Sequence, residues 1–457
     1  MAAPLATVSG PPDNPRVSMK YRTEVSYDLS ALNLRWDKRD PACDFFIHGN
    51  FVAFRAWESL CFMRLKPDGT MENVKQFALS ERGEYEIAYQ LINNGDSLLI
   101  ALVTSHVWSE NSELQVLEIC IKPNGFGTMV CHLQTGLPCT GSEVKSVAIG
   151  DPHVALVCHG ECRIINWRKK TGLGVFLVGE FDSDDEKTAR YTGDYGPSFV
   201  SPVLLVFHPT DPVLIVFDSL KRSNIHLYDI PPNMPLLKSK SSEPSRWTTR
   251  MLDSKEIHSF PNAQWDFDLS MRSAGFRHIS ASARVLDILT LKRHYLPEEE
   301  DEEEDEEDVE EDEEQYASDD SNYGVTIDTF KVKSPNVDRM KALATSRVSI
   351  SLQDWSTTTE KLEFSQNIPE AAGAKQFGNM VTVNGVFHKT VPVGSCEALI
   401  LPIFPLAGGS KPCWLRLSLP PQLRAPNVSD SPAACLFDPK SGRLYACLPE
   451  KLHVMQY

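Results

Sequence analysis

Short apolar runs separated by compact turns dominate the hydrophobic pattern of this chain. The apolar residues of 46–54 turn on Gly49-Asn50, and a second apolar run follows at 60–65. The same order returns around Gly95-Asp96 and again around Gly150-Asp151. Runs of this length, bounded by Gly, Asn and Asp, are typical of antiparallel β-hairpins. The pattern therefore predicts a series of small antiparallel sheets.

One turn motif occurs twice with its flanking strands. Phe207-His208-Pro209-Thr210-Asp211-Pro212 and Phe437-Asp438-Pro439-Lys440-Ser441-Gly442 share the form Phe-x-Pro-x-x-(Pro or Gly). Sheets that recur every ~50 residues are typical of propeller blades with loop insertions. Closing such sheets into a ring leaves only short, protected edges. We therefore predict an all-β, β-propeller-like ring of about six or seven small antiparallel blades.

The predicted domain organisation is simple. Residues 1–20 are rich in Pro, Ser and Gly and are predicted to be a flexible N-terminal segment. Residues 21–457 are predicted to form a single propeller-like domain, in which a strand near Phe45 pairs into the blade that holds the last strand, 452–457. Segment 339–346 is the one place where the residue types favour a short helix.

The net charge of −17 comes from one segment. Residues Glu298 to Asp320 hold 18 of the 62 acidic side chains and no basic ones, which leaves 44 acidic against 45 basic residues elsewhere. Like-charge repulsion without apolar anchors predicts a long disordered acidic insertion at 297–323. Such a tract either solubilises the protein or attracts a basic partner. The candidate binding residues here are Glu298, Asp301, Asp305, Glu310 and Glu314.

The tryptophans divide into two groups by their sequence context. Trp108 and Trp265 lie in polar, loop-like stretches and are candidate exposed anchors for a protein partner. Trp167 and Trp355 follow Asn or Asp at strand ends and are predicted to pack between blades.

Motifs for catalysis or cofactor binding are weak. Cys158-His159-Gly160-Glu161-Cys162 is the tightest Cys/His cluster, but it lacks the four ligands of structural zinc and is predicted to be a hairpin turn. In the stretch 172–179 the third glycine comes too late for a dinucleotide-binding loop. We therefore predict no catalytic, metal or cofactor residues and no enzymatic activity. The alternative is a propeller-fold hydrolase or lyase with a central cleft.

The composition also predicts the cellular location of the protein and the class of its partners. The 11 cysteines are odd in number and mostly lie in apolar strand patterns, as expected for reduced thiols inside the cell. The N-terminus lacks a signal-peptide pattern, and no apolar run reaches the ~18 residues of a membrane helix. No basic cluster predicts a nucleic-acid surface. The expected location is the cytoplasm, the nucleus or both, with protein partners.

Two stretches resemble the blade units of a known family. Gly150-Asp151 with the apolar residues 154–157 and the segment Ile164–Gly172, and the ending Phe437–Leu444 that closes on Leu452-His453-Val454, are similar to the C-terminal, WD-type propeller-like region of fungal F-box proteins. The resemblance extends over roughly 40–457. It implies a region that holds a substrate, while an N-terminal F-box docks on the adaptor of a cullin–RING ubiquitin ligase.

The F-box itself is not evident in this sequence. Residues 1–40 lack the early Leu-Pro and the Leu/Ile-rich helices of that module. Docking on the ligase adaptor is therefore not expected from this segment. We predict a protein-binding propeller that serves as a substrate-recognition or scaffold module related to F-box ubiquitin-ligase subunits. The alternative within this family is a truncated F-box gene product without ligase docking.

Overall fold

A computed structural model describes the strands of the chain and many of their turns. The described residues are 16–34, 45–56, 59–79, 83–106, 112–137, 144–158, 161–176, 204–218, 224–237, 249–250, 252–259, 271–278, 284–295, 340–364, 398–403, 413–421, 434–438, 441–448 and 450–457. The predicted acidic insertion at 297–323 lies outside them.

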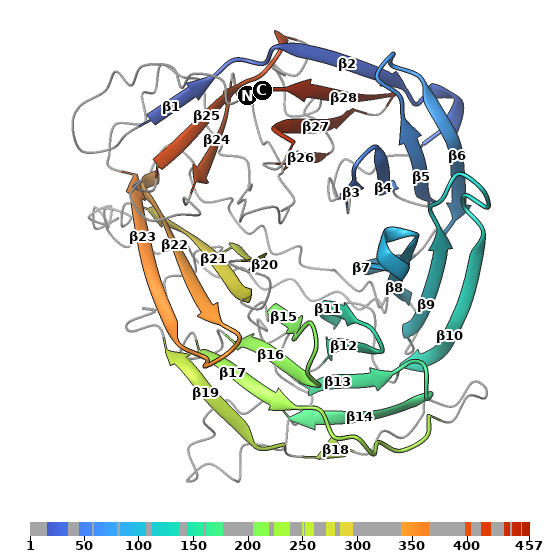
Figure 1. The fold of residues 1–457 in the computed structure, drawn as a ribbon, viewed down its shortest axis with the longest axis vertical. Helices are drawn as coiled ribbons and strands as arrows, with labels where there is room; N and C mark the ends of the chain where they lie inside the picture. The colour runs from blue at the N-terminus through green and yellow to red at the C-terminus, as the bar shows by residue number, and fades with distance from the viewer. Residues whose placement is uncertain are drawn as a thin grey trace, which may run out of the picture.

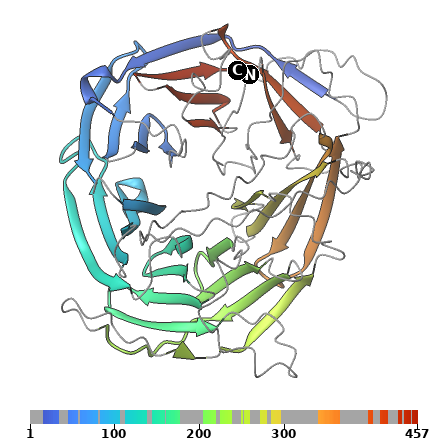
Figure 2. The ribbon, with the colours of Figure 1, turned by 180° about the vertical axis from the view of Figure 1, so that it is seen from behind.

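The described strands form seven sheets that follow one another around a common centre (Figure 1 and, from behind, Figure 2). All but two of the neighbouring strand pairs within these sheets are antiparallel. The all-β, propeller-like class predicted from the hairpin repeat is confirmed, and the seven sheets agree with the expected number of blades.

Five sheets are formed mainly from consecutive strands, and the first strand of each lies nearest the centre (Figure 1). The first two sheets contain β3 (Phe45–His48), β4 (Phe51–Ala56), β5 (Ser59–Leu65) and β6 (Met71–Ala78), then β7 (Gly83–Ile92), β8 (Ser97–His106), β9 (Ser112–Cys120) and β10 (Met129–Leu137). The third contains β11 (Val144–Gly150), β12 (His153–Cys158), β13 (Glu161–Asn166) and β14 (Thr171–Phe176), with β18 (Thr249–Arg250) added in parallel to β14. The next two contain β15 (Leu204–Phe207), β16 (Val213–Asp218), β17 (Asn224–Asp229) and β19 (Ser254–Ser259), then β20 (Met271–His278), β21 (Arg284–Tyr295), β22 (Met340–Ser351) and β23 (Thr357–Phe364).

The remaining two sheets combine strands from both ends of the chain. One contains β24 (Ala398–Ile403) and β25 (Cys413–Ser418), with β1 (Arg16–Met19) in parallel beside β25. The other contains β26 (Ala434–Asp438), β27 (Arg443–Leu448) and β28 (Lys451–Gln456), with β2 (Thr23–Asp28) antiparallel to β28. Two short 3-10 turns, η1 (Ser30–Leu32) and η2 (Asn93–Gly95), complete the described elements.

The pairing of the two chain ends corrects two predictions. The strand that joins the last strand is β2, and not the strand near Phe45, which begins the separate β3–β6 sheet. The segment predicted to be flexible, 1–20, contains β1, whose four residues pair with β25. The helix predicted at 339–346 is also wrong, because these residues lie largely in β22, between β21 and β23.

Inner and outer strands differ in burial for a geometric reason. All six residues of β4 are buried, whereas β6 in the same sheet alternates between partly buried and exposed positions. An inner strand packs against neighbouring sheets on both faces, so it reads as a continuous apolar run. An outer strand lies on the rim, where part of each face meets water. An inner strand such as β4 can therefore be predicted from its apolar residues alone.

Six of the seven neighbouring sheet pairs share a cluster of buried apolar side chains. The cluster between the first two sheets, for example, joins Phe51 and Phe62 to Leu98 and Ile100. Corresponding clusters join the other neighbours. No such cluster is found among the described side chains between the β20–β23 sheet and the β24–β25–β1 sheet. Because each sheet buries its faces against the next one, the apolar core is distributed around the ring.

Both copies of the repeated turn motif connect two strands, as predicted. Residues 208–212 connect β15 to β16, and the second copy lies between β26 and β27. Phe207 packs so closely against Gly150 of the neighbouring sheet that no side chain fits there. A Cβ on Gly150 would lie 2.5 Å from the Phe207 Cβ. Among the residues that the structure describes, no helix has the length and apolar character needed to cross a membrane.

Candidate functional site

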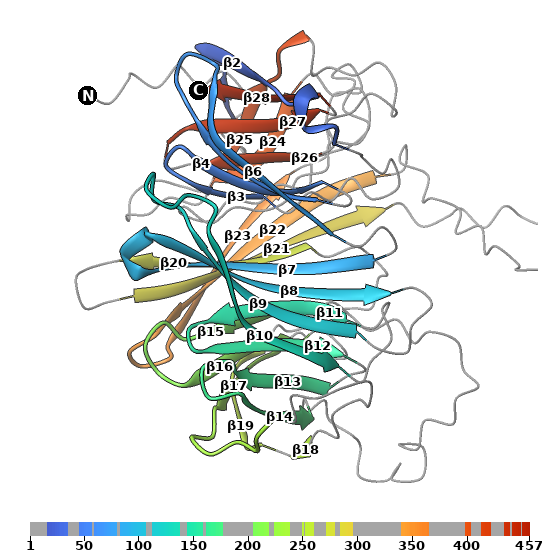
Figure 3. The same ribbon diagram turned by 90° about the vertical axis from the view of Figure 1, so that its right-hand side faces the viewer.

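The connections between strands leave the ring on two opposite sides. One side, called here the turn face, carries the short turns 49–50, 93–96, 151–152, 167–170 and 208–212. Strands alternate in direction within a sheet, so the second and fourth strands end on the opposite face. Figure 3 shows β8 and β21 running to the same side of the molecule.

The sequence-predicted binding residues lie outside the described parts of the chain. This applies to Trp108 and Trp265, and to the acidic residues Glu298, Asp301, Asp305, Glu310 and Glu314. The strands that precede them are described: β8 ends before Trp108, β19 before Trp265 and β21 before the acidic tract. These are a second, a fourth and a second strand of their sheets, so all three end on the face opposite the turn face.

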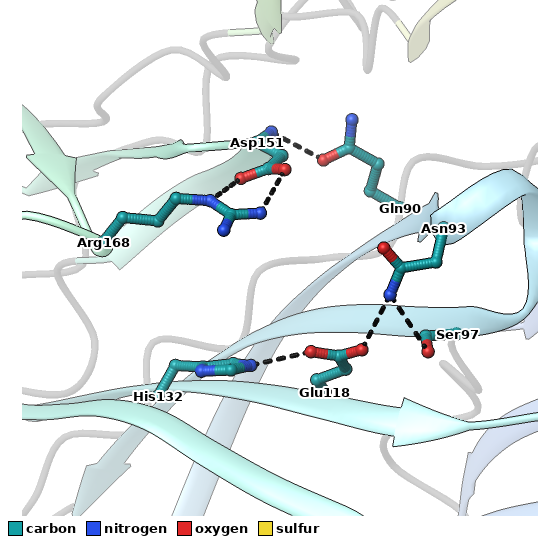
Figure 4. Close-up of polar contacts among 7 residues, drawn as sticks. All are labelled: Gln90, Asn93, Ser97, Glu118, His132, Asp151 and Arg168. Atoms are coloured by element: carbon teal, nitrogen blue, oxygen red, sulfur yellow. Dashed lines mark hydrogen bonds and ion pairs between the residues drawn. The ribbon is translucent and has the colours of Figure 1, made fainter.

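A cluster of hydrogen-bonded polar side chains lies on the turn face and connects the β7–β10 sheet to the β11–β14 sheet (Figure 4). The Oε1 atom of Gln90, on β7, accepts a hydrogen bond of 2.7 Å from the backbone N–H of Asp151. Arg168 donates from Nε and Nη2 to the two carboxylate oxygens of Asp151, at 2.8 and 2.7 Å. Two parallel bonds of this kind fix the orientation of the guanidinium. The turn after β11 is thereby held against β7.

Glu118, on β9, accepts most of the hydrogen bonds in the other half of the cluster. His132 Nε2 lies 2.8 Å from one of its carboxylate oxygens, and Asn93 Nδ2 donates to the other at 3.0 Å. Burial acts to raise the pKa of Glu118, but the hydrogen bonds from His132 and Ser97, together with the charges of His132 and Arg168, outweigh it and hold the pKa below its ordinary value. Glu118 is therefore a carboxylate at neutral pH.

Trp167 lies at the centre of the same junction. Its side chain is buried in the apolar cluster shared by the β7–β10 and β11–β14 sheets. The His132 ring is 4.8 Å from its ring centre, and the Arg168 guanidinium is 4.5 Å from it. The prediction that Trp167 packs between blades is confirmed. Trp355 likewise packs against the cluster between the β15–β19 and β20–β23 sheets, as predicted.

The chemistry of this cluster suits a structural joint better than catalysis. Ser97, Glu118 and His132 are the residue types of a hydrolase triad, but Glu118 lies between the other two. Activation of a serine requires the imidazole to bond the hydroxyl directly. The Cys158/Cys162 segment is a β12–β13 hairpin, as predicted, with Val157 opposite Cys162. Among the described residues, no group of three or more His, Cys, Asp or Glu side chains is placed to hold a metal ion.

A buried histidine on the turn face, His208, accepts a hydrogen bond through its imidazole ring. The backbone N–H of Asp211 donates to His208 Nδ1 at 2.9 Å, so this nitrogen is an unprotonated acceptor. Burial lowers the pKa of His208, and the nearby Arg284 lowers it further, against the opposing effect of the Asp211 carboxylate. Burial lowers the pKa of His153 and His258 as well.

We expect the free energy of unfolding to fall as the pH drops below about 6.5, the usual pKa of an unfolded histidine. The sign follows because the unfolded state takes up protons that the folded state resists. His208→Asn, whose side-chain oxygen can still accept from the Asp211 N–H, should reduce this fall. Urea unfolding between about pH 5 and pH 8 measures the effect. Equal pH slopes for the two proteins would contradict this role of His208.

Sequence reasoning missed the polar cluster on the turn face. Gln90, Glu118 and His132 come from three different strands and form no motif along the chain. The one available signal was the turn Gly150-Asp151, which supplies the carboxylate for Arg168.

Comparisons with known proteins give no family for the chain. No protein-family model and no curated protein matches it. Among solved structures, a chain from the complex "S. cerevisiae dbp5 l327v bound to nup159, gle1 h337r, ip6 and adp" is similar at 10% identity and a TM-score of 0.37, over 97% of both chains. Kluyveromyces lactis Hsv2 shares 12% identity over 56% of this chain and 69% of that chain, with a TM-score of 0.29. Drosophila Semaphorin 2a shares 6% over 96% of this chain and 76% of that chain, with a TM-score of 0.33. At these values no function is carried over.

Proposed function

We propose that this chain is a non-enzymatic protein-binding module that recognises a substrate or scaffolds a partner, in the manner of the propeller-like region of fungal F-box ubiquitin-ligase subunits. One observation carries the proposal. The strands that precede Trp108, Trp265 and the acidic tract, though far apart in sequence, end on the same face. Loops that leave one face of a rigid scaffold are a common basis for protein recognition.

The junctions between sheets support this use of the fold. Shared apolar clusters join six neighbouring sheet pairs, and the Trp167 junction adds hydrogen bonds between two of them. A scaffold whose sheets cannot shift keeps loops from different sheets in fixed relative positions, which lowers the entropy lost on binding.

The charge distribution along the sequence supports a basic partner. The segment from Glu298 to Asp320 has 18 acidic side chains in a chain that is otherwise nearly neutral. Such a concentrated negative field attracts a basic protein surface, and the attraction weakens as salt screens it. We therefore propose a partner with a basic surface, bound by the acidic tract together with aromatic anchors.

Affinity capture from a fungal extract tests this function with matched variants. Replacing 297–323 by an uncharged linker of equal length, or changing Trp108 or Trp265 to Ala, is expected to reduce recovery of the same partner proteins several-fold. Lys169→Ala is the control, because Lys169 is exposed on the turn face. Equal recovery by every variant would refute the proposed binding face. Adaptor or cullin subunits among the partners would support the ligase relationship, and partners without them would count against it.

A further inference from the structure

β10 is the outermost strand of its sheet in the part of the chain that the structure describes. It is the last strand in the order β10-β9-β8-β7, and none of the described residues pairs with its outward side. The neighbouring sheet differs, because the chain extends β14 with its own segments. β18 pairs with it in parallel, and Gly172 and Leu237 exchange backbone hydrogen bonds with Pro235 and Lys170 at 2.9 and 2.8 Å. Extended segments can therefore be added to outer edges of this ring.

β10 also lacks the charges that normally protect such an edge. Its nine residues include no Asp, Glu, Lys or Arg, and His132 is engaged by Glu118. The other described outer strands all carry formal charge, at Arg16 in β1, Glu24 and Asp28 in β2, Glu72 and Lys75 in β6, Arg250 in β18, Lys255 and Glu256 in β19, and Glu360, Lys361 and Glu363 in β23. Charged residues on edge strands prevent unwanted pairing with other chains. β10 is without charged residues, and its one interruption is a bulge at His132, between Cys131 and Leu133.

The side chains of β10 are exposed where a partner strand would meet them. Met129 is 42% exposed and Val130 is 49% exposed, and they are two of the three large apolar side chains exposed among the described residues. Near the other end of the strand, a Cβ on Gly136 would contact none of the described atoms within 4 Å, and its φ is not in the left-handed region. Neither packing among the described residues nor backbone conformation requires glycine there. A glycine in an edge strand leaves room for another chain to approach.

We propose that β10 is a dimer interface, at which two copies of this chain pair antiparallel about a twofold axis. A twofold interface needs a surface that is complementary to itself. Two copies of β10 pair without like charges facing each other, because the strand carries no Asp, Glu, Lys or Arg. Antiparallel pairing also brings Met129 and Val130 toward the end of the partner strand where the partner's Gly136 leaves open space.

The pairing gives a weak dimer that is independent of the proposed binding face. One pair of nine-residue strands covers less surface than a standard stable interface, so the dimer dissociates on dilution. The interface lies on the outer rim and not on the proposed binding face. Self-association can therefore be measured with the purified chain alone.

Sedimentation velocity of the full chain between about 1 and 100 µM tests the proposal, because this range covers weak dimers. The wild type is expected to shift from monomer to dimer, and Val130→Lys to raise the dissociation constant by about tenfold or more. Met129→Lys should act in the same way. Ala78→Lys is the control, since it adds the same charge to an exposed site on the outer strand β6 and should leave dimerisation unchanged.

Circular dichroism and hydrogen exchange complete the test of the β10 dimer. Circular dichroism must show the same fold for all variants, so that a loss of dimer is not a loss of structure. Hydrogen exchange should slow at amides of 129–137 when the wild type is concentrated. A wild type that stays monomeric throughout, a Val130→Lys protein that dimerises normally, or protection confined to another segment would each overturn the proposal.

Discussion

Deleting residues 1–28 is expected to abolish the cooperative unfolding transition of this chain, at a cost of more than about 5 kcal/mol, the lower end of typical domain stabilities. The deletion removes β1 and β2, and so leaves β25 and β28 with open edges in two neighbouring sheets. It also removes Tyr27, which is buried in a shared apolar cluster and donates a hydrogen bond of 2.8 Å to the carbonyl of Lys66. Thermal unfolding followed by circular dichroism measures the loss.

Complementation with a peptide provides the control. A synthetic peptide of residues 16–28 supplies both missing strands and the buried Tyr27. Added to the truncated chain, it should recover a transition that a scrambled peptide of the same composition does not. Cooperative unfolding of the truncated chain alone, at the wild-type temperature, would show that β1 and β2 are dispensable.

Trp167→Ala is expected to lower the free energy of unfolding by about 3–5 kcal/mol, the usual range for removing a large buried aromatic side chain. Trp167 is only 4% exposed and contacts the His132 ring from the neighbouring sheet. The truncation opens a cavity between two sheets and separates the two halves of the polar cluster. Urea unfolding at constant pH measures the difference.

Two variants separate packing from polar contacts at this junction. Trp167→Phe should cost much less, because Trp167 Nε1 has no hydrogen-bond partner among the described residues. Arg168→Ala should cost less than about 1 kcal/mol, because the Arg168–Asp151 ion pair is half-exposed and screened. If Arg168→Ala proved as damaging as Trp167→Ala, the ion pair and not the buried ring would hold the two sheets together.

The hairpins could be predicted because each one is encoded locally. Gly49 adopts a φ of +62° in the turn between β3 and β4, which glycine reaches without strain. The turn at 208–212 has two prolines, and the strands on each side bury apolar residues against the next sheet. Turn type and strand pattern are both visible within a few neighbouring residues, so the sheets and their approximate number followed from the sequence.

The strands at the ends of the chain could not be predicted in the same way. β2 is short, and Thr23, Glu24 and Ser26 are polar, so its membership of a sheet depends on β28. Segment 339–346 contains good helix formers, but β22 pairs with β21 on one side and β23 on the other. These contacts between strands outweigh the small differences in intrinsic helix propensity.

The polar cluster on the turn face shows a second limit of sequence reasoning. Glu118 and His132 are 14 positions apart, and their contact depends on how β10 lies beside β9. Between Cys131 and Leu133 the register shifts, which places His132 at a bulge. A pattern of apolar and polar residues does not encode such a shift. The predicted anchors Trp108 and Trp265 lie outside the described residues and remain predictions.

The pairing of β2 with β28 also constrains how the protein is made in the cell. Glu24 and His453, which are in contact across these strands, are 429 positions apart. As the ribosome elongates the polypeptide, β1 and β2 emerge early and must wait, without partners, until almost the whole ring has been translated. The ring can be completed only once its last strand, β28, has been synthesised, and exposed strands meanwhile attract other chains. Nascent copies of this protein should therefore depend on chaperones that shield their N-terminal strands.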